Sequence, residues 1–324
     1  MSDGEKYVII EAQDVTRVFP ASENRWLLAN DKVNLKMYQG ETLGIAGESG
    51  CGKSTFVKML VQLDQPTSGK ILYRGKNIAE LKGEKLRQNR RNIQMVFQDP
   101  SEAFSPKMKI KKIVCEPLLN FGVISKKQVN DKARELMRMV ELPEDFVERY
   151  PFQLSGGQRQ RVGIARALAL EPEVLICDEA TSALDVSVQK SIIQLLTRIQ
   201  KEKNITIAFI CHDVALVKNM SHRVAIMYLG NVVEIVPSRQ MGKGRMHPYT
   251  DLLIHSIFSP NMDFNKPIDG TDSEAPSPLC VPEGCPFQNR CEFCMEKCRA
   301  TKPVLREVEA GHEIACHLYD SSSG

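Results

Sequence analysis

The sequence lacks any long uncharged apolar run. No stretch approaches the ~18–20 residues that a helix needs to cross a bilayer. The first residues also lack the apolar core of a secretory signal peptide, because Asp3, Glu5 and Lys6 interrupt them. These two absences predict a cytosolic chain.

The sequence also has little excess of one charge. It contains 43 Lys and Arg against 40 Asp and Glu, which leaves a formal net charge of +3 at pH 7. Such a balance argues against a nucleic-acid-binding protein, which typically carries a strongly basic face. Hydrophobic residues at 42% and charged residues at 26% are ordinary globular values and exclude wholesale disorder. The length of 324 residues predicts about two domains.

Cysteine is sparse over the first 279 residues, which hold four of the ten, and dense after them. Of those four, Cys51, Cys177 and Cys211 are expected to be small packed residues rather than reactive thiols. In a reducing compartment, the crowding near the end indicates a metal or cluster site rather than disulfides. The crowded six are Cys280, Cys285, Cys291, Cys294, Cys298 and Cys316.

Strand and helix patterns alternate along the chain, which predicts an α/β fold. Helical spacing of apolar residues begins at Lys53 and returns over about residues 110–150. The proline-rich stretch 259–286 predicts an extended linker. Strands are expected at 33–37, 42–46, 93–97, 174–177 and 205–210, with a closing hairpin at 224–228 and 232–236.

A glycine-rich turn between the strand at 42–46 and the helix from Lys53 has the phosphate-loop pattern G-x-x-x-x-G-K-[ST]. Its glycines allow successive backbone N–H groups to point at phosphate oxygens, Lys53 adds a positive charge, and the Ser54 hydroxyl is placed for Mg²⁺. A chance glycine-rich turn is the alternative, but the flanking strand and helix argue against it. The loop consists of Gly47, Glu48, Ser49, Gly50, Cys51, Gly52, Lys53 and Ser54, and Thr55 follows it.

The strand expected at 174–177 ends in two carboxylates. Asp178 can hold Mg²⁺ through water, and Glu179 can polarise an attacking water molecule. In isolation such a pair would be interpreted as a solvated acidic turn. The phosphate loop upstream favours a hydrolytic nucleotide site instead.

A second glycine-rich segment, Leu154–Gln158, precedes another helical run. A helix N-terminus with bare backbone donors suits a phosphate group. A plain helix cap is the alternative interpretation. Because the chain already has one phosphate loop, this second cluster of donors predicts a γ-phosphate that another subunit supplies.

Together these motifs resemble the ATP-binding subunit of ABC transporters, over about residues 7–240. The phosphate loop, the segment 154–158 and the acidic strand occur in the family's order, together with 96–100, 182–185 and 210–213. The resemblance implies a P-loop NTPase fold with a RecA-like α/β core, an antiparallel β subdomain and a helical subdomain over about residues 100–168. It also implies that ATP and Mg²⁺ bind, and that two subunits sandwich two ATP molecules.

The resemblance also implies roles for single catalytic residues. Glu179 would act as the general base, and His212 would bind the γ-phosphate and support Glu179. Gln98 would contact Mg²⁺ and the attacking water, with Ser54 and Asp178 as the other magnesium ligands.

Nucleotide-binding residues follow from the same resemblance. Asp185 would lie at the dimer interface. An aromatic residue upstream of the phosphate loop usually stacks on adenine, and Phe19 is the first candidate with Trp26 as the alternative. The residues that would complete the partner's site are Ser155, Gly156, Gly157 and Gln158.

Four of the late cysteines, Cys285, Cys291, Cys298 and Cys316, are separated by five, six and seventeen residues. Four thiolates can hold a 4Fe–4S cluster or a tetrahedral Zn²⁺, and unpaired reduced cysteines are the third possibility. The segments around them, together with 247–250, resemble the cysteine-rich C-terminal extension of the oligopeptide/dipeptide (peptide/nickel) importer ATPases. That resemblance favours the iron–sulfur cluster. The roles of Cys280 and Cys294 stay open.

The expected protein is thus a peripheral ATPase at the cytoplasmic face of the membrane, with an ATPase domain at 1–258 and the extension at 259–324. The segment 93–100 is closer to the "F"-type subunit of such importers. Expected partners are two transmembrane permease subunits, an extracytoplasmic substrate-binding protein and a second ATPase subunit, with a paralogue favoured over a second copy. The cargo would be peptides, with a nickel chelate or another small solute as the alternative. A soluble ABC ATPase outside transport and a nucleotide-binding module without turnover are the rival functions.

Overall fold

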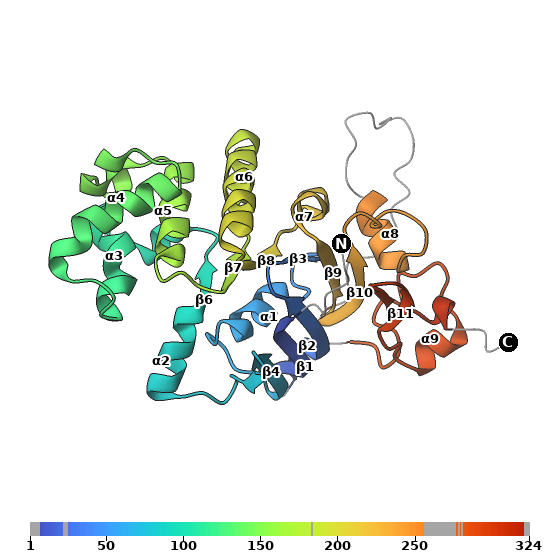
Figure 1. The fold of residues 1–324 in the computed structure, drawn as a ribbon. Coiled ribbons are helices and arrows are strands. Elements are labelled where there is room, and N and C mark those ends of the chain that lie inside the picture. The colour runs from blue at the N-terminus through green and yellow to red at the C-terminus, as the bar shows by residue number, and fades with distance from the viewer. Residues whose placement is uncertain are drawn as a thin grey trace. The chain divides into compact units, whose positions relative to one another are not determined.

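The computed structural model describes residues 7–21, 25–182, 184–255, 277, 279 and 281–320. In that part, the chain forms two compact units, each assembled from separate stretches. The first comprises Tyr38–Thr42 and Glu80–Cys211, and the second comprises Tyr7–Met37, Leu43–Ala79 and the residues from His212 onward. Figure 1 labels most helices and strands of both units. Most of the expected linker at 259–286 lies outside the described residues.

The first unit contains a parallel sheet of β6 (Ile93–Val96), β7 (Val174–Asp178) and β8 (Thr206–Ile210), with β7 in the middle. Val174 pairs with Ile93 on one side and with Thr206 on the other. β7 and β8 are buried along nearly their whole length, as continuous apolar strands in a covered parallel sheet should be. The predicted strands at 93–97, 174–177 and 205–210 are confirmed, although β6 ends at Val96.

The same unit carries the helical part of the chain, coloured cyan to yellow in Figure 1. α3, α4 and α5 pack against one another, and their apolar faces form a buried core. The helical pattern predicted over 110–150 is therefore confirmed. The helices are α2 (Gly83–Asn92), α3 (Ile110–Asn120), α4 (Val129–Met139), α5 (Gly156–Leu168) and α6 (Val186–Lys203), with the short 3₁₀ turns η1 (Pro100–Ala103), η2 (Lys126–Gln128), η3 (Glu144–Glu148) and η4 (Pro151–Gln153).

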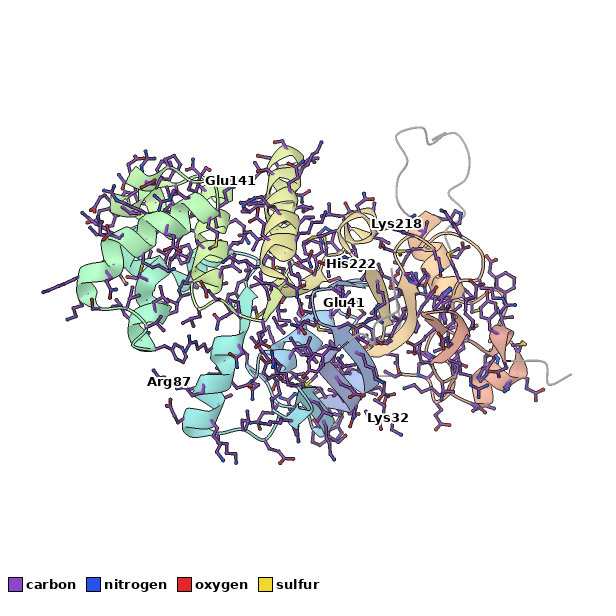
Figure 2. The ribbon with its side chains drawn as sticks, viewed as in Figure 1. Lys32, Glu41, Arg87, Glu141, Lys218 and His222 are labelled. Carbon is purple, nitrogen blue, oxygen red and sulfur yellow. The ribbon has the colours of Figure 1, made fainter. Side chains whose placement is uncertain are left out.

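A short strap at Tyr38–Thr42 belongs to the first unit. The buried Glu41, labelled in Figure 2, accepts a hydrogen bond from the Tyr38 amide at 2.7 Å. The Glu41 carbonyl accepts from the amide of Ile207 on β8 at 2.8 Å. These bonds fix the strap beside the parallel sheet.

The second unit has two sheets. The first has the order β2-β1-β4-β5, in which β4 is antiparallel to both β1 and β5. Its strands are β1 (Val8–Pro20), β2 (Trp26–Tyr38), β4 (Ser68–Tyr73) and β5 (Lys76–Asn77). In β2, Val33, Leu35 and Met37 are buried and alternate with exposed residues, as the sequence pattern predicted.

The other sheet of this unit pairs β3 (Thr42–Ala46) in parallel with β9 (Arg223–Tyr228). β10 (Asn231–Pro237) returns antiparallel to β9, and both residues of the intervening turn, Leu229 and Gly230, have positive φ. That geometry is typical of a tight hairpin turn, so the predicted closing hairpin is confirmed.

The C-terminal segment adds strands to this second sheet rather than forming a separate sheet. β12 (His312–Ile314) pairs antiparallel with β10, and β11 (Arg306–Glu309) pairs with β12. The helices of the unit are α1 (Lys53–Leu60), α7 (Val214–Met220), α8 (Pro248–His255) and α9 (Glu296–Ala300), followed by the 3₁₀ turn η5 (His317–Tyr319). No helix in the described ranges is long and apolar enough to cross a membrane.

Candidate functional site

The phosphate loop lies between β3 and α1, with its lysine turned into the loop. Lys53 is only 5% exposed, and its Nζ donates to the carbonyls of Gly47 at 2.7 Å and Glu48 at 2.8 Å. An ammonium group has three donors, so these bonds leave one. That donor faces the Cys51 sulfur at 3.7 Å, a weak acceptor that a phosphate oxygen would replace. The loop is therefore closed around its lysine and keeps one donor for an anion.

Two glycines of the loop are required by close packing. A Cβ on Gly47, whose φ is +151°, would lie 2.2 Å from the Met227 carbonyl oxygen of β9. A Cβ on Gly52, whose φ is +99°, would lie 2.1 Å from the Ala29 carbonyl oxygen of β2. Because backbone atoms cannot move aside, these positions admit only glycine. Both sheets of the second unit thus shape the loop.

Glu48 is bound from outside the loop, by residues to which the sequence analysis gave no site role. Its amide donates to the Tyr249 hydroxyl oxygen at 2.9 Å, and its carboxylate accepts from Arg290 at 3.0 Å. The sequence contained a signal, since 247–250 and Arg290-Cys291 both belong to the segments that resemble peptide-importer ATPases. That resemblance indicated the peptide-importer branch, but it predicted no contact between these residues and the phosphate loop.

The acidic pair lies where β7 ends, in the first unit. Asp178 is the last residue of the strand, and both Asp178 and Glu179 are half-buried. Glu179 adopts a positive φ of 48°, its amide donates to the Ile210 carbonyl at 3.0 Å, and its carbonyl accepts from the Ser182 hydroxyl at 3.0 Å. These bonds hold the backbone of Glu179 in a conformation that is unusual for a residue with a side chain.

The segment 154–158 forms the expected helix N-terminus, so that prediction is confirmed. Ser155 caps α5: its hydroxyl accepts from the Gln158 amide at 3.3 Å, and the Gln158 side chain accepts from the Ser155 amide at 3.0 Å. This capping box satisfies two amides. The amides of Gly156 and Gly157 belong to the first turn, where no intrahelical acceptor exists, and can face a ligand.

The remaining site candidates are distributed over both units. In the first unit, Gln98 is exposed after β6 and Asp185 is exposed at the N-cap of α6. In the second unit, His212 is exposed before α7. Phe19 is half-buried on β1, where the Arg17 guanidinium lies 4.3 Å from its ring centroid, and Trp26 on β2 is 62% exposed. The second unit thus holds the phosphate loop, Phe19, Trp26 and His212, and the first holds Gln98, Asp178, Glu179, Asp185 and the segment 154–158.

The four late cysteines gather in the second unit near α9. Cys285 and Cys298 are buried, and the Cys285 amide donates to the Cys298 carbonyl at 2.7 Å. Burial, with a smaller contribution from the neighbouring thiols of Cys298, Cys316 and Cys291, raises the pKa of Cys285 to about 12. Across the described residues, no group of three or more His, Cys, Asp or Glu side chains is arranged to hold a metal ion. Cys280 lies outside the described residues.

The early cysteines are packed, as expected. Cys51, Cys177 and Cys211 are all buried. Burial raises the pKa of the Cys177 thiol to about 12, and it raises the pKa of Cys51 as well. Thiols with raised pKa values carry little thiolate at neutral pH, which agrees with a packing role.

Comparisons with known proteins reveal likeness along almost the whole chain. The family described as ABC transporter matches residues 30–182, and the family described as oligopeptide/dipeptide transporter, C-terminal region, matches residues 233–298. The chain is 41% identical to the oligopeptide transport ATP-binding protein OppF of Salmonella typhimurium, with 98% of each chain covered. It is 40% identical to the oligopeptide transport ATP-binding protein AppF of Bacillus subtilis, over 98% of this chain and 100% of AppF.

The fold also resembles solved structures. The ATP-binding cassette MJ0796, solved as a dimer in a post-hydrolysis state bound to ADP and Pi, has a TM-score of 0.65 and 33% identity, over 71% of this chain and 99% of its own. The chain cbiO1 from Clostridium perfringens, part of the ABC transporter complex cbiONQ, has a TM-score of 0.65 and 28% identity, over 73% of this chain and 90% of its own.

Proposed function

Because this chain belongs to the ATP-binding subunits of ABC transporters, in the oligopeptide branch, we propose that it hydrolyses ATP to power peptide import through a membrane permease. The observation that carries the proposal is the closed phosphate loop, in which two carbonyls position Lys53 and one ammonium donor is left for a phosphate. A phosphate loop alone would also suit other nucleotide hydrolases. The second glycine-rich segment, Leu154–Gln158 at the start of α5, is called the signature segment below, and it favours the ABC class.

In this proposal phosphate binding, Mg²⁺ binding and proton transfer are carried out by different residues of the chain. The phosphate loop binds the β- and γ-phosphates through backbone amides and Lys53. Ser54, Gln98 and Asp178 hold Mg²⁺, which neutralises phosphate charge. Glu179 accepts the proton of the attacking water, and His212 orients the γ-phosphate.

Other residues contact the adenine at one end of the nucleotide and the γ-phosphate at the other end. Phe19 stacks on adenine, with Trp26 as the alternative. The signature segment of one subunit, with Ser155 at its helix cap, donates amides to the γ-phosphate held by the other subunit. Asp185 lies at the interface between those subunits.

Replacing Glu179 with Gln tests the catalytic assignment. The amide cannot accept the proton, so we expect nucleotide binding to persist while the hydrolysis rate falls by about 10²-fold or more, the contribution typical of a general base. Turnover of ATP by the purified chain gives the rate, and binding of a fluorescent ATP analogue gives the affinity. Glu171→Gln, an exposed glutamate before β7, is the matched control. Hydrolysis at the parental rate in Glu179→Gln would remove Glu179 from the role of base.

We propose two permease subunits, a second ATPase subunit of a paralogous chain and an extracytoplasmic binding protein as partners. The residues 1–258 would form the ATPase body at the cytoplasmic face of the membrane, and 259–324 the extension. Support for a permease partner comes from the relatives, whose names describe oligopeptide transport ATP-binding proteins. Uptake of labelled peptides by vesicles that contain the whole importer tests the proposed cargo. Uptake of a nickel chelate, without uptake of peptides, would show that the chelate is the cargo instead.

We propose that Cys285, Cys291, Cys298 and Cys316 hold a 4Fe–4S cluster, with Zn²⁺ as the alternative. The support is their gathering near α9, where burial first and the neighbouring thiols second raise the pKa values of Cys285 and Cys316, so that a bound cation is what would draw these thiols into the thiolate form that ligates iron. Anaerobic purification should yield brown protein with about four irons and four sulfides per chain. Cys294→Ser, a half-buried neighbour, should retain the iron, and Cys298→Ser should lose it. Colourless protein that contains zinc would favour the alternative.

A further inference from the structure

Glu48, the second residue of the phosphate loop, is bound at each of its polar groups. Its amide donates to the Tyr249 hydroxyl oxygen at 2.9 Å, and its carbonyl accepts from Lys53 at 2.8 Å. Its two carboxylate oxygens each accept from one guanidinium nitrogen of Arg290 at 3.0 Å. The backbone and side chain of this residue are therefore held together, and two of these partners, Tyr249 and Arg290, lie outside the loop.

Both outside partners come from the C-terminal part of the chain. Tyr249 lies on α8, 201 residues after Glu48, and Arg290 precedes Cys291, 242 residues after it. The pairing of β12 with β10 attaches this region to the sheet that also contains β3. The C-terminal region thus reaches the phosphate loop through two side chains.

The Arg290 side chain is enclosed by aromatic rings rather than exposed on the surface. It is 10% exposed, and its guanidinium carbon lies 5.9 Å from the ring centroid of Tyr228 and 5.8 Å from that of Phe287. The ring centroids of Tyr228 and Tyr249 are 4.5 Å apart, and the ring centroid of Phe287 lies 5.2 Å from that of Tyr228. These aromatic rings restrict the arginine and exclude water, and both effects strengthen a charge-assisted hydrogen bond.

The pair also has an electrostatic consequence. The Glu48 carboxylate is an anion within a loop whose proposed ligand is a triphosphate. Without a counter-charge it would repel that ligand, and Arg290 supplies the counter-charge at hydrogen-bonding distance. The same bond orients Glu48, whose carbonyl positions Lys53.

We propose that Arg290 is a positioning residue for ATP, which acts through Glu48 to hold the phosphate loop and to cancel its negative charge. The inference rests on the proposed function, because it names ATP as the ligand. It makes the C-terminal region a part of the nucleotide site, whether or not the cysteines hold a cluster.

The main test uses Arg290→Met in the full chain, with binding of a fluorescent ATP analogue in the presence of Mg²⁺. We expect its Kd, and the KM for ATP, to rise about tenfold, as loss of a charge-assisted hydrogen bond would produce, while kcat changes less than about twofold. Arg290→Lys keeps the charge and should lie between. Arg306→Met is the matched control, because Arg306 is an exposed arginine of the same region that pairs with Asp320. Arg290→Met with the affinity of the Arg306→Met control would overturn the proposal.

A second variant separates the contact from general damage to the aromatic site. Glu48→Gln removes the negative charge without altering Arg290 or its rings. In the double variant Glu48→Gln/Arg290→Met, the repulsion is absent, so we expect a Kd within about threefold of Glu48→Gln alone. If the Kd of the double variant rose by the product of the two single-variant factors, Arg290 would not act through Glu48. Failure of the parent chain to bind or hydrolyse ATP would instead contradict the proposed function.

Discussion

Gly157 packs against Val188 at the point where the helix of the signature segment meets α6. A Cβ on Gly157 would lie 2.4 Å from Cγ1 of Val188, whereas a Cβ on Gly156 would meet its nearest neighbour, Leu184, at 3.5 Å. Valine in a helix has one strongly preferred rotamer and cannot turn aside at little cost. The two adjacent glycines therefore have different reasons to be glycine. Gly157 is required by packing, and Gly156 is not.

We expect Gly157→Ala to lower the free energy of unfolding by about 1–3 kcal/mol, the usual cost of overpacking. Gly156→Ala should change it by less than about 0.5 kcal/mol, because the added methyl group makes an ordinary contact. Urea denaturation followed by circular dichroism measures both. Val188→Ala in the Gly157→Ala background should restore part of the loss. Equal effects of the two alanine variants would show that Val188 is not the cause.

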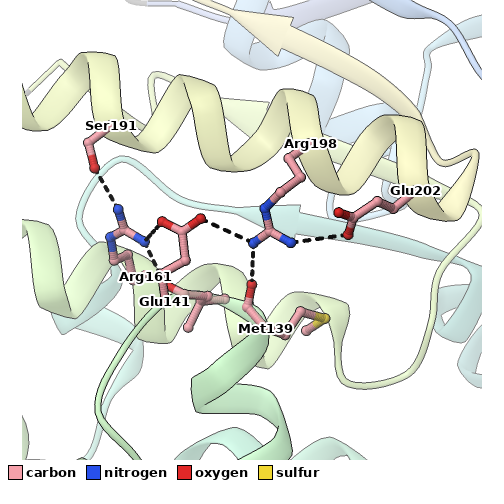
Figure 3. Close-up of polar contacts among 7 residues, drawn as sticks. Met139, Glu141, Arg161, Ser191, Arg198 and Glu202 are labelled. Carbon is pink, nitrogen blue, oxygen red and sulfur yellow. Dashed lines mark hydrogen bonds and ion pairs between the residues drawn. The ribbon is translucent and has the colours of Figure 1, made fainter.

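At the scale of elements, a polar network joins the end of α4 to α5 and α6 (Figure 3). Glu141, which follows α4 with φ at +56°, accepts from Arg161 of α5 at 2.9 Å and lies 3.3 Å from Arg198 of α6. Arg161 also donates to the Val140 carbonyl at 2.6 Å and to the Ser191 hydroxyl at 2.5 Å. The Glu141 carboxylate thus bridges an arginine of α5 and an arginine of α6 at the end of α4.

The two arginines of this network should contribute unequally to stability. The Arg161 side chain is 13% exposed and that of Arg198 is 37% exposed. We expect Arg161→Met to lower the free energy of unfolding by about 2 kcal/mol, because the part-buried Val140 carbonyl and Ser191 hydroxyl lose their donor. Arg198→Met should cost less than about 1 kcal/mol, since water screens an exposed pair. Urea titrations at low and high salt measure both, and the Arg198 effect should shrink more in salt than the Arg161 effect. The reverse order would refute this ranking.

Sequence patterns located these elements well because helices and strands are encoded by local spacing. The apolar residues of α4 and the continuous apolar run of β7 were sufficient to predict both elements. The network at Glu141 was not predictable, since it joins residues that become neighbours only after the helices pack. The positive φ of Glu141 likewise follows from its place at the end of α4 and not from its residue type.

At the scale of the whole molecule, the C-terminal region is attached to the sheet through a buried polar cluster. Glu234 of β10 is fully buried, and its carboxylate lies 2.7 Å from Nε2 of His312 on β12 and accepts from the His247 amide at 2.9 Å. Nδ1 of His247 accepts from the Tyr249 amide at 3.0 Å. This bond needs a neutral imidazole and leads directly to the tyrosine that contacts the phosphate loop.

The buried imidazole predicts a pH dependence of stability. Burial lowers the pKa of His247 to about 3, from an ordinary value of 6.5. Below pH 6.5 the unfolded chain therefore binds a proton that the folded chain does not. The stabilisation is complete above that pH and declines as the pH falls towards the folded pKa, by at most about 1.4 kcal/mol per pH unit.

We expect His247→Asn to flatten this dependence, because an Asn side-chain oxygen can accept from the same amide without titrating. Urea denaturation at pH 7.5 and pH 5.5 measures the change, which should be smaller in His247→Asn than in the parent chain by about 1 kcal/mol. His255→Asn, at an exposed histidine at the end of α8, is the control and should leave the difference unaltered. An unchanged pH dependence in His247→Asn would show that other groups cause it.

The sequence by itself was sufficient to identify the family of this protein, the ATP-binding subunits of ABC transporters. A phosphate loop, a helix cap and a strand that ends in two carboxylates are each formed by a few consecutive residues, so the residue order alone is enough to predict them. Only the tertiary structure decided what holds these motifs. Arg290 and Tyr249 reach Glu48 across more than 200 residues, and Val188 occupies the space that a side chain at Gly157 would need. Local patterns specify backbone conformation, whereas contacts between distant residues arise only when the whole chain packs.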